Sequence, residues 1–185
     1  MLKTPRLTLR PLEKEDLAML YKLYSNQEVL RLMTDNIQML ETVKKLIALQ
    51  IQHQKKFGYS LMAVIENETG NFIGRAGIIN RVLNPEIGEE DEVRFAIFPE
   101  FWGKGYGKEI LQEIICFAKD DLKLPGIVAA NTPRNEKAVE FLKKNGFKYI
   151  KTLIERGHYI REIQYYTMSF PQNIKNKAVQ TAISD

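Results

Sequence analysis

The chain has 185 residues and a formal net charge of +4, and its sequence pI is about 9.0. This length suits one domain with a full core, and an apolar content of 44% excludes global disorder. No apolar run is long enough to span a bilayer, and the N-terminus lacks the apolar segment of a secretory signal. The single cysteine, Cys116, excludes an internal disulfide and fits a reducing compartment. We therefore expect a cytoplasmic protein with no membrane partner.

The basic charge alone does not indicate a nucleic-acid partner. Lysines and arginines stand beside acidic residues, as in Glu13-Lys14-Glu15-Asp16, and no block of arginines interleaved with aromatic residues is present. A nucleic-acid surface normally gathers its positive charge on one face, so the pattern favours ordinary solvated faces. A nucleic-acid or ribosome-associated binding protein stays an alternative, and a steep salt dependence of RNA binding would identify it.

The first part of the chain predicts a strand and two helices. Residues 5–10 alternate between polar and apolar side chains, which is typical of a strand. Residues 13–24 place apolar side chains at helical spacing after a polar start. A second helix is predicted over residues 40–57, and Gly58 ends it.

Three strands are predicted next. The first two cover residues 59–66 and 72–80 and are joined by the turn-rich residues 67–70. An acidic connector over residues 84–90 then leads to a strand over residues 91–98, which ends before a proline.

The last part of the chain alternates between helix and strand. A long amphipathic helix is predicted beyond Gly105. It is followed by a buried strand, a short helix and a closing pair of strands, over residues 126–131, 135–144, 147–154 and 159–170. This order is mixed α/β and not doubly wound. Residues 1–170 are therefore expected to form a single domain, and residues 171–185 a polar C-terminal tail.

Three glycines, Gly103, Gly105 and Gly107, follow the strand over residues 91–98 and lead into the long helix. Free backbone amides at a helix N-terminus bind phosphate oxygens, and glycines let the backbone come close to them. The spacing excludes two common phosphate loops. Glu109 follows Lys108 where a nucleoside triphosphatase needs Ser or Thr, and Lys108 stands where the dinucleotide fingerprint needs its third glycine.

Three motifs in this order resemble those of the GNAT family of N-acetyltransferases. Trp102-Gly-Lys-Gly-Tyr-Gly107 is similar to the family's Gln/Arg-x-x-Gly-x-Gly/Ala signature, and its leading Trp resembles the RimJ/RimL-like branch. Asn135-Glu-Lys-Ala138, with Phe141 and Lys144-Asn-Gly-Phe147 after it, resembles the second cofactor segment. Thr4-Pro-Arg-Leu-Thr-Leu-Arg-Pro11 resembles the first strand of that branch. The resemblance covers residues 4–170.

The resemblance implies the GNAT fold, a bent and mostly antiparallel sheet of about seven strands flanked by helices. The fourth and fifth strands splay apart in that fold, and acetyl-CoA, the implied co-substrate, lies between them. Its pantetheine would pair with the backbone of Ala96, Ile97 and Phe98 and contact Asn135, and its diphosphate would lie on Trp102, Gly103, Lys104, Gly105, Tyr106, Gly107 and Lys108. No metal is implied, and His53 and His158 have no cysteine at ligand spacing.

The implied activity is transfer of acetyl from acetyl-CoA to a primary amine, on a small molecule or a protein N-terminus, by direct attack. The resemblance is also compatible with a homodimer. Amines of this kind are largely protonated at neutral pH, so the reaction needs a base. Glu92, at the start of the strand that would pair with the pantetheine, is the predicted catalytic base. The alternative is a charged residue at a strand end that faces solvent.

The general acid stays open. Relatives often carry Tyr where this chain has Leu142 and Ser where it has Ala138. Tyr106, Tyr149, Tyr165 or water are the candidates, and Tyr106 is better explained as a packing residue. Cys116 has no histidine partner in the sequence, which argues against an acyl-cysteine route. The absent Tyr and Ser also keep a second interpretation open, a catalytically silent acyl-CoA-binding module of the same fold.

The acidic run Glu86-Ile-Gly-Glu-Glu-Asp-Glu92 leads into the strand expected to line the active centre. Carboxylates at the mouth of a cleft attract cations. One hypothesis is therefore an acceptor with positive charge beyond the reacting amine, and the alternative is a solvated surface loop.

Overall fold

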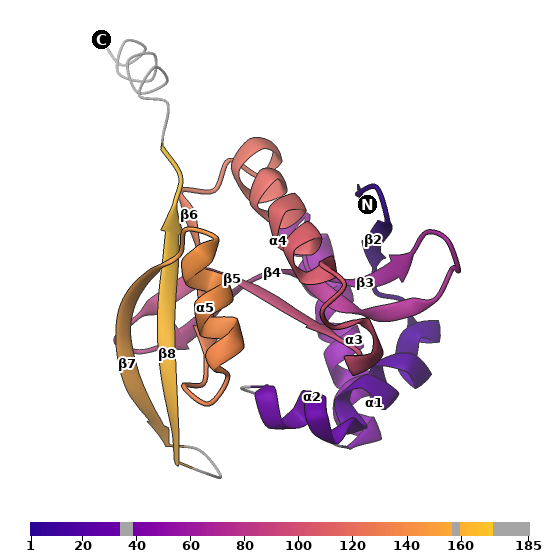
Figure 1. Ribbon diagram of the computed structural model, residues 1–185, viewed down its shortest axis with the longest axis horizontal. Coiled ribbons are helices and arrows are strands. Elements are labelled where there is room, and N and C mark those ends of the chain that lie inside the picture. Colours follow the sequence, from indigo (N-terminus) through magenta and orange to yellow (C-terminus); the bar gives the residue numbers. More distant parts are fainter. Residues whose placement is uncertain (34–38, 157–159, 172–185) are drawn as a thin grey trace.

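The computed structural model describes residues 1–33, 39–156 and 160–171, and Figure 1 shows the arrangement of their helices and strands. The strands are β1 (Leu2–Lys3), β2 (Leu7–Pro11), β3 (Leu61–Glu66), β4 (Phe72–Asn84), β5 (Gly88–Ile97), β6 (Gly126–Asn131), β7 (Lys148–Arg156) and β8 (Ile160–Ser169). The α-helices are α1 (Leu17–Ser25), α2 (Gln27–Leu32), α3 (Leu40–Phe57), α4 (Tyr106–Cys116) and α5 (Glu136–Lys144). Within these ranges, no helix has the length and apolar character needed to cross a membrane.

All eight of these strands form one sheet, in the order β1-β2-β3-β4-β5-β6-β8-β7. The neighbouring strands β5 and β6 are parallel, and the other neighbours are antiparallel. β5 and β6 pair at one position, where Glu92 lies opposite Val128. Beyond this point β5 continues to Ile97 without pairing to β6, and the two ribbons diverge (Figure 1). The predicted mixed and mostly antiparallel sheet is thus confirmed, and the very short β1 brings the number of strands to eight.

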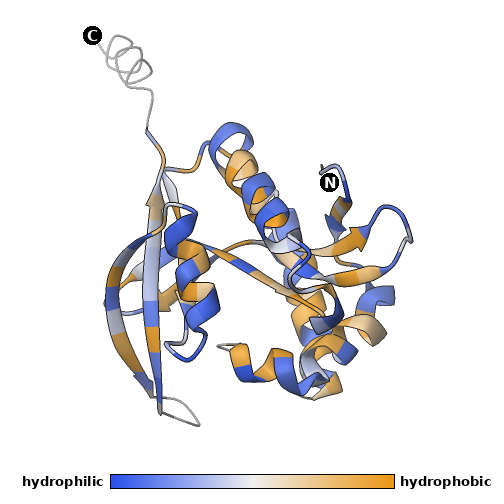
Figure 2. Ribbon diagram, in the orientation of Figure 1, coloured by the Kyte–Doolittle hydropathy of each residue, from blue (hydrophilic) through white to orange (hydrophobic). Residues whose placement is uncertain are grey.

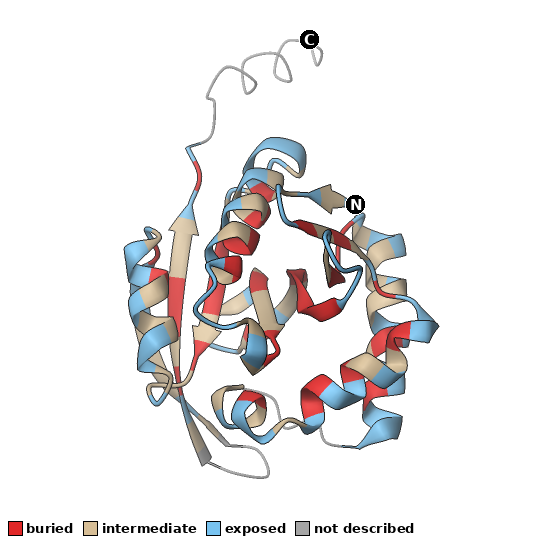
Figure 3. Cartoon of the chain, turned by 45° about the vertical axis from the view of Figure 1, so that its right-hand side comes forward, coloured by how far each residue is buried: buried red, intermediate tan, exposed pale blue. Residues whose placement is uncertain are grey.

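Helices cover both faces of the sheet. The core on one face includes Ile110 and Ile114 of α4, and the core on the other includes Leu20 of α1 and Ile47 of α3. Burying an aliphatic side chain of this size contributes roughly 1.5–3 kcal/mol, so these contacts fix each helix to its face. The amphipathic pattern of α4 is visible in its hydropathy (Figure 2) and in the buried stripe along one side of the helix (Figure 3).

Several predicted elements are confirmed closely. Helix α3 begins and ends as expected, and Gly58 caps it with a φ of 81°, in the left-handed region that favours glycine. Strand β6 covers the expected residues. Helix α5 begins one residue after Asn135, whose side-chain oxygen accepts from the amide of Ala138 as an N-cap.

The predicted acidic connector over residues 84–90 is wrong. Asn84 already pairs with Gly88, so β4 and β5 form one long hairpin and Glu89 and Glu90 belong to β5. The acidic side chains are tolerated in this strand because its first residues are only partly buried or exposed and because Arg81 of β4 forms an ion pair with Glu92. Cross-strand pairing of opposite charges stabilises such a ladder.

The sequence did not predict α2, β1 or the end of α4. Helix α2 has six residues and depends on Asn26, whose side chain accepts from the amides of Glu28 and Val29. Periodicity cannot identify so short a helix. After Cys116 the chain continues as a π-helical turn over Phe117–Asp121. Most of the predicted tail, residues 172–185, and His158 lie outside the described residues.

Candidate functional site

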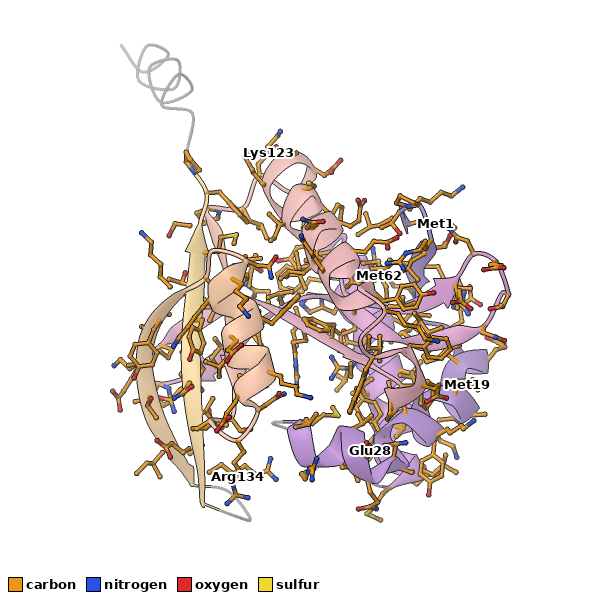
Figure 4. The ribbon with its side chains drawn as sticks, viewed as in Figure 1. Met1, Met19, Glu28, Met62, Lys123 and Arg134 are labelled. Carbon is orange, nitrogen blue, oxygen red and sulfur yellow. The ribbon has the colours of Figure 1, made fainter. Side chains whose placement is uncertain are left out.

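A cleft opens where β5 and β6 stop pairing. Its apolar wall includes Leu32 and Met33 at the end of α2, Phe95 of β5, and Phe141 and Leu142 of α5. Its polar groups are Arg75, Arg94, Asn131 and Asn135. In Figure 4, Glu28 on α2 and Arg134 in the loop before α5 are labelled on opposite sides of this region. The cleft therefore draws on elements from both halves of the sheet.

At the predicted pantetheine position, one residue of β5 has its backbone groups directed toward the gap between β5 and β6. The amide of Phe98 donates to the carbonyl of Ile73 at 2.9 Å, so it faces β4. Because backbone groups of successive strand residues point to opposite sides, the amide and carbonyl of Ile97 face away from β4. The carbonyl accepts from the indole Nε1 of Trp102 at 2.8 Å. Of the predicted residues Ala96, Ile97 and Phe98, it is Ile97 whose amide is directed toward the gap.

The glycine loop, Trp102–Lys108, leads into α4 and includes its first three residues. Gly103 and Gly105 have φ values of 73° and 82°, which residues with a β-carbon rarely adopt. Gly105 is the N-cap residue of α4. The first amides of the helix have no partner within it, and the helix dipole adds positive potential at this end. The loop is therefore built to accept an anion such as a diphosphate.

Arg6 ties the glycine loop to the start of the chain. Its Nη1 donates to the carbonyl of Lys104 at 2.9 Å, and its Nη2 lies 2.7 Å from Oε2 of Glu109. Thr4 and the backbone amide of Arg6 also donate to the Glu109 carboxylate. Burial alone raises the pKa of Glu109, but the hydrogen bonds from Thr4 and Arg6 outweigh it and hold that pKa below its ordinary value. We call Arg6, Lys104 and Glu109 the Arg6 clamp.

Tyr106 belongs to the core, as the packing interpretation expects. It is 8% exposed, its ring packs against Phe101 and under the guanidinium of Arg6, and its hydroxyl donates to Glu66. That hydrogen bond is the main cause of a raised Tyr106 pKa. A contribution of Tyr106 to cofactor binding would therefore come from its backbone amide.

Glu92 is inside the fold and does not face solvent at a strand end. It is 1% exposed, and its Oε2 lies 2.7 Å from Nε of Arg81 and 3.8 Å from Nε of Arg94. A buried carboxylate needs such partners because desolvation of an unpaired charge is costly. The alternative of a solvent-facing strand-end residue is therefore wrong. Glu92 occupies the last paired position before the cleft.

The tyrosine candidates for the general acid differ in their surroundings. Tyr149 is 52% exposed and its hydroxyl contacts Thr152. Tyr165 is buried, and its hydroxyl donates to Glu155. Burial and then that hydrogen bond raise the pKa of Tyr165, which makes it a poorer proton donor.

The acidic run has partners of its own. Glu86 forms an ion pair with Lys151 at 3.0 Å, Asp91 accepts from the hydroxyl of Tyr59, and Glu92 is paired with Arg81. Burial and the neighbouring Asp91 raise the pKa of Glu90. Among the described residues, those that line the cleft include none of this run. Cys116 is exposed, and no cluster of metal-ligating side chains occurs in the described ranges.

This geometry coincides with a family match. Residues 6–148 match the model of the acetyltransferase (GNAT) domain. The chain belongs to the GNAT family of acetyltransferases. The match spans the glycine loop and the cleft, and as a member of this family the enzyme uses acetyl-CoA as its co-substrate.

Named relatives agree with this assignment. An uncharacterized N-acetyltransferase, p20 of Bacillus licheniformis, is 29% identical over 152 residues, which are 80% of this chain and 82% of p20. Spermidine N(1)-acetyltransferase of Vibrio cholerae is 26% identical over 162 residues, 85% of this chain and 84% of the relative.

Solved structures support the fold. An acetyltransferase from Agrobacterium tumefaciens has a TM-score of 0.76 and 24% identity, covering 91% of this chain and 94% of the other. A spermidine N-acetyltransferase from Vibrio cholerae, solved in complex with CoA and spermine, has a TM-score of 0.71 and 21% identity, covering 90% and 96%.

Sequence reasoning missed two arginines of this region. Arg81 is the partner of Glu92, and Arg75 lines the cleft with only 2% exposure. Both lie in β4: Arg75 is inside the strand that the sequence predicts over residues 72–80, within a mostly apolar run, and Arg81 follows that range. An arginine within such a run is a signal in itself, because arginine is almost never fully buried without a partner.

Proposed function

We propose that this enzyme acetylates a primary amine by direct attack on acetyl-CoA in a ternary complex. The observation that carries the proposal is the cleft at the end of the β5–β6 pairing, where the lining residue Phe95 lies next to Gly107 of the glycine loop. A thioester placed there is reachable from the side of α2, because Leu32 and Met33 line the same space as Phe141 of α5. Both substrates can then be held at once, which removes most of the entropic cost of their encounter.

For the cofactor, the amides at the start of α4 would hold the diphosphate and the backbone of Ile97 would pair with the pantetheine. Gly103, Gly105 and the Arg6 clamp support the first role, because they set the loop conformation. Asn135 supports the second role from the opposite wall of the cleft. Its side-chain oxygen caps α5, so the contact with the pantetheine would come from its amide nitrogen.

In the reaction, the amine nitrogen attacks the carbonyl carbon of the thioester, an amide bond forms and the carbon–sulfur bond breaks. Glu92 would take one proton from the ammonium before the attack, directly or through water, and the nitrogen gives its second proton to water as the amide forms. Another backbone amide of β5 on the side of the gap would donate to the carbonyl oxygen as its negative charge develops. The thiolate of CoA leaves with the electron pair of the broken bond and is protonated by water, since Tyr106 lies in the core and Tyr165 donates to Glu155.

Within the family, we place the chain in the RimJ/RimL-like branch. Trp102 in the first position of the loop motif and the opening Thr4–Pro11 support this assignment. The indole of Trp102 also has a structural role in this chain, because it donates a hydrogen bond to the carbonyl of Ile97 and so fixes the end of β5.

An acceptor with extra positive charge is a second candidate. The relative from Vibrio cholerae, named for its action on spermidine, favours it. The acidic run gives it little support, because Glu86 and Glu92 are already paired with Lys151 and Arg81. The candidate therefore rests mainly on a relative that is 26% identical.

Release of CoA thiol from acetyl-CoA, followed across a panel of primary amines, tests the proposal. The panel should hold small amines, amino acids, spermidine and peptides with free N-termini. We expect turnover with at least one class, with one amide formed for each CoA released. Tight acetyl-CoA binding by calorimetry without turnover on any amine would instead identify a silent acyl-CoA-binding module.

A further inference from the structure

Arg75 is a buried cation in the wall of the cleft. It lies in β4, is 2% exposed and lines the cleft. Its neighbours across the sheet are Ala63 and Ala96, which pack with the α1 and α3 side of the core. The guanidinium is therefore on the same side of the sheet as α1, where the acceptor would enter.

This guanidinium has no polar partner among the residues that the structure describes. Its Nε and Nη1 are buried and make no hydrogen bond. The contact that Arg75 does make is with the ring of Tyr24, whose centroid lies 5.6 Å from the guanidinium carbon. The hydroxyl of Tyr24 is itself buried and without a hydrogen-bond partner. Two unsatisfied buried polar groups thus lie side by side.

Such an arrangement is costly for the protein alone. An arginine cannot release its proton at any ordinary pH, and a buried unpaired charge is strongly destabilising. Neighbouring acids do not relieve it, because Glu92 is 2.7 Å from Arg81 and 3.8 Å from Arg94. The cleft therefore holds two arginines, Arg75 and Arg94, but no lining carboxylate among the described residues.

We propose that Arg75 binds a carboxylate of the acceptor, so that the substrate is an amine that also carries a carboxylate group. The inference rests on the proposed amine acetylation and names its substrate class. A guanidinium offers parallel N–H donors that match the two oxygens of a carboxylate. Arg75 would fix the acceptor by its acid group and leave its amine free to attack the thioester.

Matched acceptors that differ only in this group test the proposal. We would compare glycine, β-alanine, L-leucine and 6-aminohexanoate with their carboxamides, and with spermidine, by the rate of CoA release. The wild-type enzyme is expected to show kcat/KM at least ten-fold higher for one of these carboxylates than for its amide. Equal rates for every pair, or a preference for the amides or spermidine, would overturn the proposal.

Arg75→Met gives the second measurement. The variant is expected to lose the preference for the carboxylate over its amide, through a rise in KM for the carboxylate. Because it removes an unpaired buried charge and keeps the volume of the side chain, its free energy of unfolding should equal or exceed that of the wild type. A clear loss of stability would show that Arg75 has a structural partner and would count against the proposal. Arg75→Lys, which keeps the charge without the fork, should retain only part of the preference.

Binding without turnover separates this inference from the proposed function. In the presence of CoA, the preferred carboxylate should raise the melting temperature of the wild type and not of Arg75→Met. If this shift occurs while no amine is acetylated, the carboxylate site stands and the acetylation proposal fails. If amines are acetylated but no carboxylate is preferred or bound, the acetylation proposal is supported and the carboxylate site at Arg75 is refuted.

Discussion

Nε of Arg81 lies 2.7 Å from Oε2 of Glu92, so the proposed base is one half of an ion pair in which the carboxylate is 1% exposed. The pair fixes the carboxylate at the last position where β5 and β6 are joined. Because of this ion pair, Glu92 stabilises the fold whether or not it also takes part in the reaction. Experiments on Glu92 must therefore separate a proton-transfer role from a loss of stability.

Glu92→Gln is expected to lower kcat/KM for an ammonium acceptor at neutral pH by about 10²–10⁴-fold, as for other general bases. Acetyl-CoA affinity should be nearly unchanged. The defect should shrink as the pH rises, because free amine then accumulates without help from the enzyme. Steady-state rates across the pH range, with calorimetry for acetyl-CoA, measure both effects.

The matched control is Arg81→Gln, which breaks the same ion pair from the other side. A defect of similar size and pH dependence in both variants, together with a similar loss of stability, would show that the ion pair acts structurally. Wild-type rates for Glu92→Gln at every pH would remove Glu92 from the mechanism.

Gly105→Val should weaken acetyl-CoA binding at least ten-fold, or about 1.4 kcal/mol. The φ of 82° at Gly105 opposes a β-branched residue, and the amides of the loop must come close to the diphosphate. Gly70→Val is the control, because Gly70 also has a positive φ, of 70°, but lies in the turn between β3 and β4. Both variants should lose stability, and only Gly105→Val should lose affinity in calorimetry. Unchanged affinity in Gly105→Val would mean that the diphosphate lies elsewhere.

Glu109→Gln is expected to destabilise the protein by about 1–2 kcal/mol at neutral pH, because it breaks the Arg6 clamp. The pKa of Glu109 is lowered in the folded state. Its stabilisation is therefore present above its unfolded pKa, near 4.3, and is lost as the pH falls through the lower folded value. Thermal unfolding should show a gap between wild type and variant at pH 7 that closes below about pH 4. Glu113→Gln, one turn along α4, should show no such gap.

Asn135→Asp separates capping from cofactor binding. The carboxylate keeps the acceptor that caps α5, so the free energy of unfolding should be close to that of the wild type, whereas Asn135→Ala should cost about 1 kcal/mol. Loss of the amide nitrogen should weaken acetyl-CoA binding several-fold if that nitrogen contacts the pantetheine. If Asn135→Asp binds acetyl-CoA with wild-type affinity, Asn135 caps α5 but does not contact the pantetheine.

The strongly periodic elements could be predicted from the sequence, and the pairings between distant residues could not. Helix α3 and its cap at Gly58 follow from local spacing and one glycine, and the glycine loop from its own residues. The partner of Glu92 is on β4, and the register that places Arg81 beside it depends on the turn between β4 and β5, for which the sequence predicts an acidic connector. The unpartnered state of Arg75 is likewise a property of the packed structure. An arginine in an apolar run can be noticed in the sequence, but its partners or their absence depend on residues that are distant along the chain.

The Arg6 clamp also bears on the order in which the molecule folds. Arg6 and Glu109 are 103 positions apart in the chain, whereas β4 and β5 form a hairpin through a short turn. Contacts that close a long loop carry a larger entropic cost and tend to form late. During refolding we therefore expect the hairpin to protect its amides from hydrogen exchange before the protein gains affinity for acetyl-CoA. The gain of acetyl-CoA affinity would then report the last step of folding, in which the first strand docks onto the rest of the domain.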